Sequence, residues 1–132
     1  MSDATTPTEL RVLLVEDSPR IAERLRELID STPGLRVVST ADAQAQALAI
    51  LAREPVDAMV LDLQLRAGTG FGILESLGTQ RPDTIIFTNH AIKQYRDKAQ
   101  RLGVRHFLNK AVDHDQLVEI LVQLRDLKPP PR

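Results

Sequence analysis

Acidic, hydroxyl and amino side chains follow four of the short apolar runs in this sequence. Glu16 and Asp17 follow the first run, Asp62 follows the third, Thr88 the fourth and Lys110 the fifth. If the runs are strands of one parallel sheet, these groups converge at one edge, where such sheets bind ligands. Three carboxylates repel one another unless a cation neutralises them, and Mg²⁺ accepts a few carboxylates together with water and phosphate oxygens. The set therefore suits phosphoryl transfer, in which a carboxylate can itself be the nucleophile.

Each of these residues also has an ordinary explanation when it is taken alone. Asp17 would stabilise a helix N-terminus, Thr88 would end a strand, and Lys110 would lie in solvent. Asp62 is harder to explain in this way, because it sits between Leu61 and Leu63, where an unpaired carboxylate is costly. The ordered combination at the ends of different runs favours a chemical role.

The elements that must position these groups alternate along the chain. One helical pattern begins at Pro19, after the N-cap residue Ser18, and ends before Pro33. A second helical pattern, later in the chain, ends at Gly103. The predicted strands cover 12–15, 35–38, 56–61, 84–87 and 106–108, and further helices cover 43–53 and 71–77, a face marked by Ile92, Tyr95, Ala99 and Leu102, and a segment after Asp113.

Two of these helices carry more detailed predictions. In the helix over 43–53, the expected buried face consists of Ala45, Leu48, Ala49 and Ala52. In the last helix, Asp113 and Gln116 have the spacing of a capping box, and the expected buried stripe consists of Leu117, Ile120, Leu121 and Leu124. Five strands alternating with five helices predict an α/β fold, a doubly wound parallel sheet covered on both faces.

Composition bounds the function classes. The 132 residues suit one domain over 10–126, with an N-terminal tail over 1–9 and a Pro-rich tail over 127–132. A net charge of −1 argues against a nucleic-acid partner held by bulk charge, and 3% aromatic residues argue against base stacking. No cysteine is present, and neither a membrane span nor a signal peptide is recognisable. We therefore expect a cytoplasmic protein with no nucleic-acid or membrane partner.

The ordered motifs resemble the receiver domain of bacterial two-component response regulators over about 10–126. The resemblance is carried by the acidic pair Glu16 and Asp17, by Asp62 with Gly70 eight positions later, by Phe87 and Thr88, and by the segment 107–110. It implies the flavodoxin-like (βα)5 fold with strand order 2-1-3-4-5.

The resemblance also implies a role for each site residue. Asp62 would accept the phosphoryl group, which Lys110 and Thr88 would contact, and Phe107 would rotate inward as Thr88 moves. Mg²⁺ would be held by Asp17, by Asp62, by the backbone carbonyl of Gln64 and, largely through water, by Glu16. Gln64 and His90 occupy the variable positions that influence how long the phosphoryl group persists.

Three residues depart from the family pattern. Arg66 and Ala111 replace prolines, and Asn89 replaces a small residue. Arg66 predicts a looser or differently shaped loop, and Asn89 predicts crowding beside the phosphoryl group. The family proline at position 111 commonly follows a cis bond, which is costly without proline. The Lys110–Ala111 bond is therefore either trans, with a shifted lysine, or strained.

The leading hypothesis is a stand-alone, single-domain response regulator. It would receive its phosphoryl group from a histidine kinase or a histidine phosphotransfer protein and signal to a separate partner, with a phosphorylation-dependent homodimer also open. The alternative is a receiver-fold interaction module that acts without phosphorylation. An aspartate-nucleophile phosphatase is disfavoured because Gln64 stands where a second Asp is needed, and a flavodoxin-like electron carrier because Glu16 and Asp17 occupy the phosphate-loop position.

Overall fold

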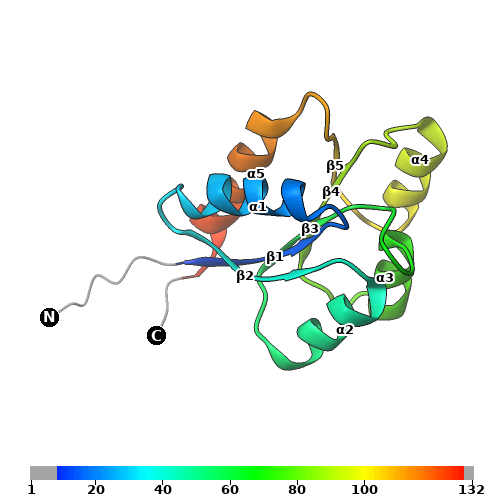
Figure 1. Cartoon of the computed structure of the whole chain (residues 1–132), viewed down its shortest axis with the longest axis horizontal. Coiled ribbons are helices and arrows are strands. Elements are labelled where there is room, and N and C mark those ends of the chain that lie inside the picture. The colour runs from blue at the N-terminus through cyan, green and yellow to red at the C-terminus, as the bar shows by residue number, and fades with distance from the viewer. Residues whose placement is uncertain (1–8, 130–132) are drawn as a thin grey trace, which may run out of the picture.

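The computed structural model describes residues 9–129, and within that range five parallel strands form one sheet (Figure 1). The spatial order is β2-β1-β3-β4-β5. The strands are β1 (Leu10–Val15), β2 (Leu35–Ala41), β3 (Ala58–Leu61), β4 (Asp83–Thr88) and β5 (His106–Asn109). The helices that alternate with them are α1 (Pro19–Asp30), α2 (Gln44–Arg53), α3 (Gly70–Leu77), α4 (Lys93–Arg101) and α5 (His114–Leu127). The predicted doubly wound α/β fold and its strand order are confirmed.

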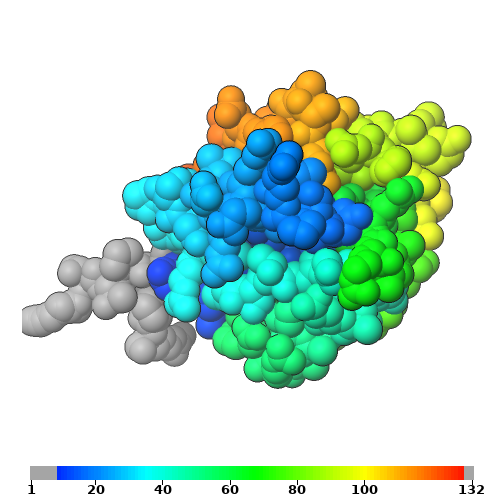
Figure 2. Space-filling model, in the orientation of Figure 1, coloured from blue at the N-terminus to red at the C-terminus, as the bar shows by residue number. Residues whose placement is uncertain are grey.

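The sheet is buried on both faces because alternate side chains of each strand enter different cores. Val12 and Leu14 of β1 pack with α1 and α5, whereas Leu13 and Val15 pack with α2, α3 and α4. This arrangement explains the near-continuous apolar strands. Figure 1 shows α1 and α5 on one side of the sheet and α2 and α3 on the other, and Figure 2 shows the surfaces of α1 and α2 above and below the sheet in the same view.

The prediction for the buried face of α2 was wrong. Ala47 and Ile50 are buried, Leu48 is half-buried, and Ala45, Ala49 and Ala52 are exposed. The helix turns its larger isoleucine towards the sheet, because Ile50 removes more apolar area from water than an alanine does. A stretch rich in alanine therefore carries a weak signal for its own orientation.

The predicted capping box at α5 is also not formed. Asp113 occupies the N-cap position, but its side chain accepts no hydrogen bond from the first turn of the helix. Its carboxylate accepts one from the backbone N–H of Asn109 instead, at 2.8 Å. The predicted stripe is confirmed in part, since Leu117 and Leu121 are fully buried while Ile120 and Leu124 are half-buried.

Hydrogen bonds and ion pairs join the two ends of the described chain near the amino-terminal ends of the strands. Asp57 accepts hydrogen bonds from the backbone and side chain of Arg11, at 2.8 and 3.0 Å, and from Lys128, at 2.8 Å. Lys128 also donates to the backbone carbonyl of Glu9. Residues 1–8 and 130–132 of the predicted tails lie outside the described residues.

Because of Asp57, we expect the folding stability of the protein to depend on pH in the acidic range. Burial opposes its ionisation, but the hydrogen bonds from Arg11 and Lys128 outweigh this effect and lower the pKa of Asp57 to about 2. The folded-state pKa is lower than the unfolded one, so the stabilisation is complete above about pH 4 and is lost as the pH falls towards 2. We expect the Asp57→Asn variant to lose about 1–2 kcal/mol near neutral pH, and the deficit to shrink below about pH 4.

Urea denaturation of both proteins between about pH 7 and 3 measures this difference. The control is Asp83→Asn, because Asp83 is an exposed carboxylate at the start of β4. A deficit that stays constant across this pH range would contradict the assignment to Asp57.

Candidate functional site

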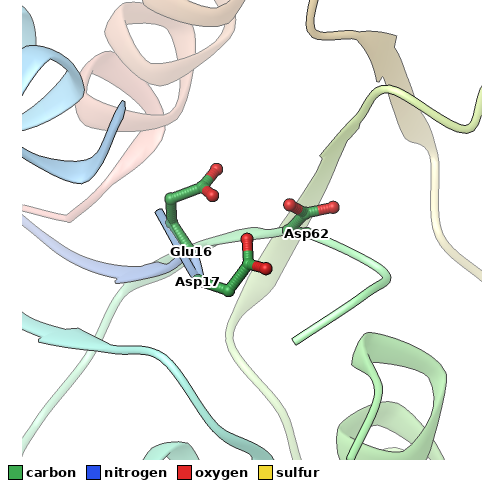
Figure 3. Close-up of side chains that lie close together, drawn as sticks. All are labelled: Glu16, Asp17 and Asp62. Carbon is green, nitrogen blue, oxygen red and sulfur yellow. The ribbon is translucent and has the colours of Figure 1, made fainter. Parts of the chain in front are cut away.

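Three carboxylates meet where β1 and β3 end, as the sequence predicted. The two strands are parallel neighbours with Val15 paired to Leu61, so the residues that follow them are placed side by side. One carboxylate oxygen from each of Glu16, Asp17 and Asp62 lies within 4.8 Å of the others (Figure 3). Glu16 and Asp62 are buried, whereas Asp17 is exposed.

Lys110 inserts its ammonium group between the two buried carboxylates. Its Nζ lies 2.5 Å from Glu16 Oε1 and 2.7 Å from Asp62 Oδ2, and only 6% of its side chain is exposed. Burial lowers the pKa of Lys110, but its hydrogen bonds to Asp62 and Glu16 outweigh this and raise it. The ammonium therefore stays protonated at neutral pH.

The remaining oxygens of the buried carboxylates bind backbone N–H groups. Glu16 Oε2 accepts from Ser18 at 3.0 Å, and Asp62 Oδ1 accepts from Leu63 at 2.7 Å. Burial raises the pKa of Glu16, and the hydrogen bonds from Lys110 and Ser18 oppose that rise only in part. Three carboxylates and one ammonium make a site that attracts a further cation.

Thr88 lies at the same edge, at the end of β4. Its side chain is fully buried, and its Oγ1 accepts a hydrogen bond from the backbone N–H of His90 at 3.1 Å. Its backbone carbonyl accepts from the N–H of Lys110 at 2.9 Å, so pairing of β4 with β5 sets Thr88 beside the lysine. The hydroxyl hydrogen of Thr88 remains available as a donor.

Phe107 is half-buried on β5, two residues before the end of the strand. The guanidinium of Arg96, on α4, lies over the ring at 4.7 Å from its centroid, and the same group donates a long hydrogen bond, 3.4 Å, to the Phe107 carbonyl. Phe107 thus packs at the edge of the core beneath an α4 side chain. The sequence pointed to Phe107 as a site residue but did not predict its contact with Arg96.

Arg66 ties the loop after β3 to the loop after β2. Its guanidinium makes two hydrogen bonds of 3.1 Å to the carboxylate of Asp42, and its backbone N–H donates to the Asp42 carbonyl. The N–H of Gln44 donates to the carbonyl of Ala67 in the same zone. Side-chain and backbone hydrogen bonds to the segment at Asp42 therefore hold the loop that contains the exposed Gln64.

The Lys110–Ala111 bond is trans, as is every peptide bond in residues 9–129. The lysine still reaches both carboxylates, so the trans alternative brings no displacement out of the site. Asn89 and His90 are exposed after β4. Asn89 lines a hollow of about 350 Å³ together with Lys110, with Arg24 and Leu28 of α1, and with His114 of α5. The sequence carried no signal for this hollow, because its walls come from three separate segments.

The comparisons with known proteins place the chain in a family. Residues 12–122 match the response regulator receiver domain family, which is most of the 132-residue chain. The chain therefore belongs to that family, whose members receive signals in two-component systems. Within residues 9–129, none of the helices has the length and apolar character needed to cross a membrane.

Individual relatives and structures agree with this assignment. Transcriptional regulatory protein CitT of Bacillus subtilis is 24% identical over 119 residues, which cover 89% of this chain and 53% of CitT. Response regulator protein PilR of Pseudomonas aeruginosa is 30% identical over 124 residues, covering 91% of this chain and 27% of PilR. The chain thus spans about half, or less, of the length of these relatives.

Two solved structures show the same fold. The response regulator domain of Thermotoga maritima CheB has a TM-score of 0.82 at 22% identity, and the match covers 92% of this chain and 99% of that one. The non-phosphorylated HemR receiver domain from Leptospira biflexa has a TM-score of 0.80 at 27% identity, covering 94% of this chain and all of that one.

Removal of the Lys110 ammonium tests the electrostatics of the site. We expect the Lys110→Met variant to lose about 3 kcal/mol of unfolding free energy at neutral pH without divalent metal, because two buried carboxylates then lack their cation. The loss should shrink as the pH is lowered, since protonation of a carboxylate relieves the repulsion.

Urea denaturation in the presence of a chelator measures both effects. The matched control is Lys93→Met, because Lys93 has 86% of its side chain exposed and its ion pair with Asp97 lies on the surface of α4. If Lys110→Met were as stable as the native protein at neutral pH, the ammonium would not hold the carboxylates together.

Proposed function

We propose that this chain is a phosphoacceptor of two-component signalling and that Asp62 carries the phosphoryl group. The observation that supports this function best is the buried ammonium of Lys110 in contact with Asp62 and Glu16, beside the exposed carboxylate of Asp17. Membership of the receiver domain family points to the same role. A histidine kinase or a histidine phosphotransfer protein is the proposed donor.

In the proposed reaction, a carboxylate oxygen of Asp62 attacks the phosphorus of a phosphohistidine. An O–P bond forms, the N–P bond breaks, and its electron pair stays on the imidazole nitrogen, which leaves. Lys110 already contacts Asp62 Oδ2, so its charge is in place to offset the negative charge of the incoming phosphoryl group. Such catalysis consists mainly of positioning and charge neutralisation.

The site also fits Mg²⁺, because its donors are hard oxygen ligands and one of them is open to solvent. Asp17 and Asp62 would hold the ion directly, with the backbone carbonyl of Gln64 as a further ligand. Glu16 would act through water, because its two oxygens already bind Lys110 and Ser18. When bound, the ion supplies charge that neutralises the carboxylates and the phosphoryl oxygens.

We further propose that Thr88 and Phe107 form the conformational switch. The buried Thr88 hydroxyl has a hydrogen to donate, and a phosphoryl oxygen on Asp62 is the acceptor it would turn towards. Phe107 lies on the neighbouring strand, so movement of Thr88 opens space for the ring to leave its position under Arg96. Gln64 and His90, both exposed beside the site, would tune access of water to the acyl phosphate.

The output of the switch is proposed to lie in a separate protein in the cytoplasm, reached by a changed surface or by a phosphorylation-dependent homodimer. Each of these outputs requires two populations of one fold with different surfaces, and phosphorylation shifts the balance between them.

Labelling with a small phosphodonor tests the phosphoacceptor role. With phosphoramidate and Mg²⁺, intact mass spectrometry should show a single added phosphoryl group, and the Asp62→Asn variant should show none, because an amide is not a nucleophile of this kind. Asp83→Asn is the matched control and should label as the native chain does, since Asp83 is exposed at the opposite edge of the sheet.

Failure of the native chain to label, together with no binding of Mg²⁺, would contradict this function. It would favour the alternative of a receiver-fold interaction module that acts without phosphorylation.

The switch has its own test by NMR, since the chain contains only three phenylalanines. Phosphorylation should move the ring signals of Phe107 far more than those of Phe87, which is already in the core. In Thr88→Ala the protein should still accept the phosphoryl group, but the Phe107 signals should stay near their unphosphorylated positions. Thr79→Ala, which changes an exposed threonine, is the control. If the Phe107 signals moved as far in Thr88→Ala as in the native chain, movement of the ring would not depend on the Thr88 hydroxyl.

A further inference from the structure

The turn between β5 and α5 carries Lys110 without the help of a proline. It consists of only four residues, 110–113, and its Lys110–Ala111 bond is trans. A lysine has a long, flexible side chain, so the position of its ammonium depends on how firmly its backbone is held. The backbone of Lys110 must therefore be fixed by hydrogen bonds within the turn.

Asn109 and Asp113 supply those hydrogen bonds. The side-chain oxygen of Asn109 accepts from the N–H of Ala111 at 2.8 Å, and the carboxylate of Asp113 accepts from the N–H of Asn109 at 2.8 Å. The backbone carbonyl of Asn109 accepts from Val112 and Asp113, at 3.2 and 2.9 Å. Asn109 is thus the centre of the turn, and Asp113 closes it.

The backbone N–H groups of Asn109 and Lys110 point to opposite sides of β5. The N–H of Lys110 donates to Thr88 on β4, so the N–H of Asn109 points to the open side of β5, which is the edge strand of the sheet. The Asp113 carboxylate takes that outward N–H. The backbone of Lys110 is therefore held in two ways. Its own N–H is bound by Thr88 of β4, and the N–H of the preceding residue, Asn109, is bound by Asp113 on the opposite side of β5.

We propose that Asp113 and Asn109 are positioning residues for Lys110, which replace the rigidity of the missing proline with two side-chain hydrogen bonds. This inference deepens the proposed function and rests on it for its catalytic consequence. Its structural content, the placement of the ammonium between Glu16 and Asp62, stands independently. It also explains why Asp113 turns back towards β5 instead of capping α5.

Acetylation of lysines tests the placement directly and needs no phosphorylation. At a low dose of acetic anhydride, peptide mass spectrometry compares Lys110 with Lys93, the exposed internal reference. We expect Lys110 to react at least about tenfold more slowly in the native chain, because it is buried and bonded to two carboxylates. Asp113→Ala should raise the relative rate of Lys110 about fivefold or more.

Conservative variants and a matched control separate positioning from general loosening. In Asp113→Asn the amide oxygen can still accept the N–H of Asn109, so Lys110 should stay protected. Asp30→Ala removes the same kind of bond elsewhere, since Asp30 accepts the backbone N–H of Val37 at 2.8 Å. This control should leave the protection of Lys110 unchanged. Asn109→Ala, which removes the acceptor for Ala111, should expose Lys110 in the same way if Asp113→Ala does not fold.

The catalytic arm measures the rate of labelling by phosphoramidate with saturating Mg²⁺. Asp113→Ala should lower the maximal rate about five- to tenfold with little change in the donor concentration for half-maximal rate, and Asp113→Asn should recover it. If Lys110 stays protected in both Asp113→Ala and Asn109→Ala, or if Asp30→Ala exposes it equally, the inference is overturned. Absence of labelling in the native chain would instead defeat the proposed function, while acetylation would still decide the positioning role.

Discussion

The ammonium group of Lys110 between two buried carboxylates is the interaction on which the rest of this site depends. A pair of buried carboxylates without a cation is strongly unfavourable, and removal of one partner of a buried ion pair leaves an uncompensated charge. Glu16 and Asp62 come from adjacent parallel strands, and Lys110 follows the edge strand, two strands away from β3. The apolar, doubly covered sheet is therefore the scaffold that holds three distant segments within contact of one another.

The loops around this ion pair hold their shape through side-chain hydrogen bonds, at places where the family resemblance led us to expect proline. Arg66 binds the carboxylate of Asp42 across two loops, and Asp113 binds the backbone next to Lys110. A proline restricts one dihedral angle permanently, whereas a hydrogen bond can open.

Much of this arrangement followed from the sequence, because strand ends in a parallel sheet share an edge. The position of each apolar run was enough to bring Glu16, Asp17 and Asp62 together. The buried face of α2 was not predictable in the same way. Three alanines with Leu48 form one apolar face, and Ala47 with Ile50 forms a competing one. The hydrogen bond from the N–H of Asn109 to the carboxylate of Asp113 was missed, because the spacing of Asp113 and Gln116 matches a helix cap. Only the position of β5 at the edge of the sheet leaves this N–H free to compete for the carboxylate. At Asp113, the tertiary position of β5 therefore overrides the local capping pattern.

In the proposed function, the ion pair with Lys110 prepares one carboxylate, that of Asp62, to become an acyl phosphate. Borohydride reduction after treatment with phosphoramidate and Mg²⁺ converts an aspartyl phosphate to homoserine, and peptide sequencing by mass spectrometry locates it. We expect homoserine at position 62 alone. Homoserine at position 17, or none in a chain that binds Mg²⁺, would contradict it.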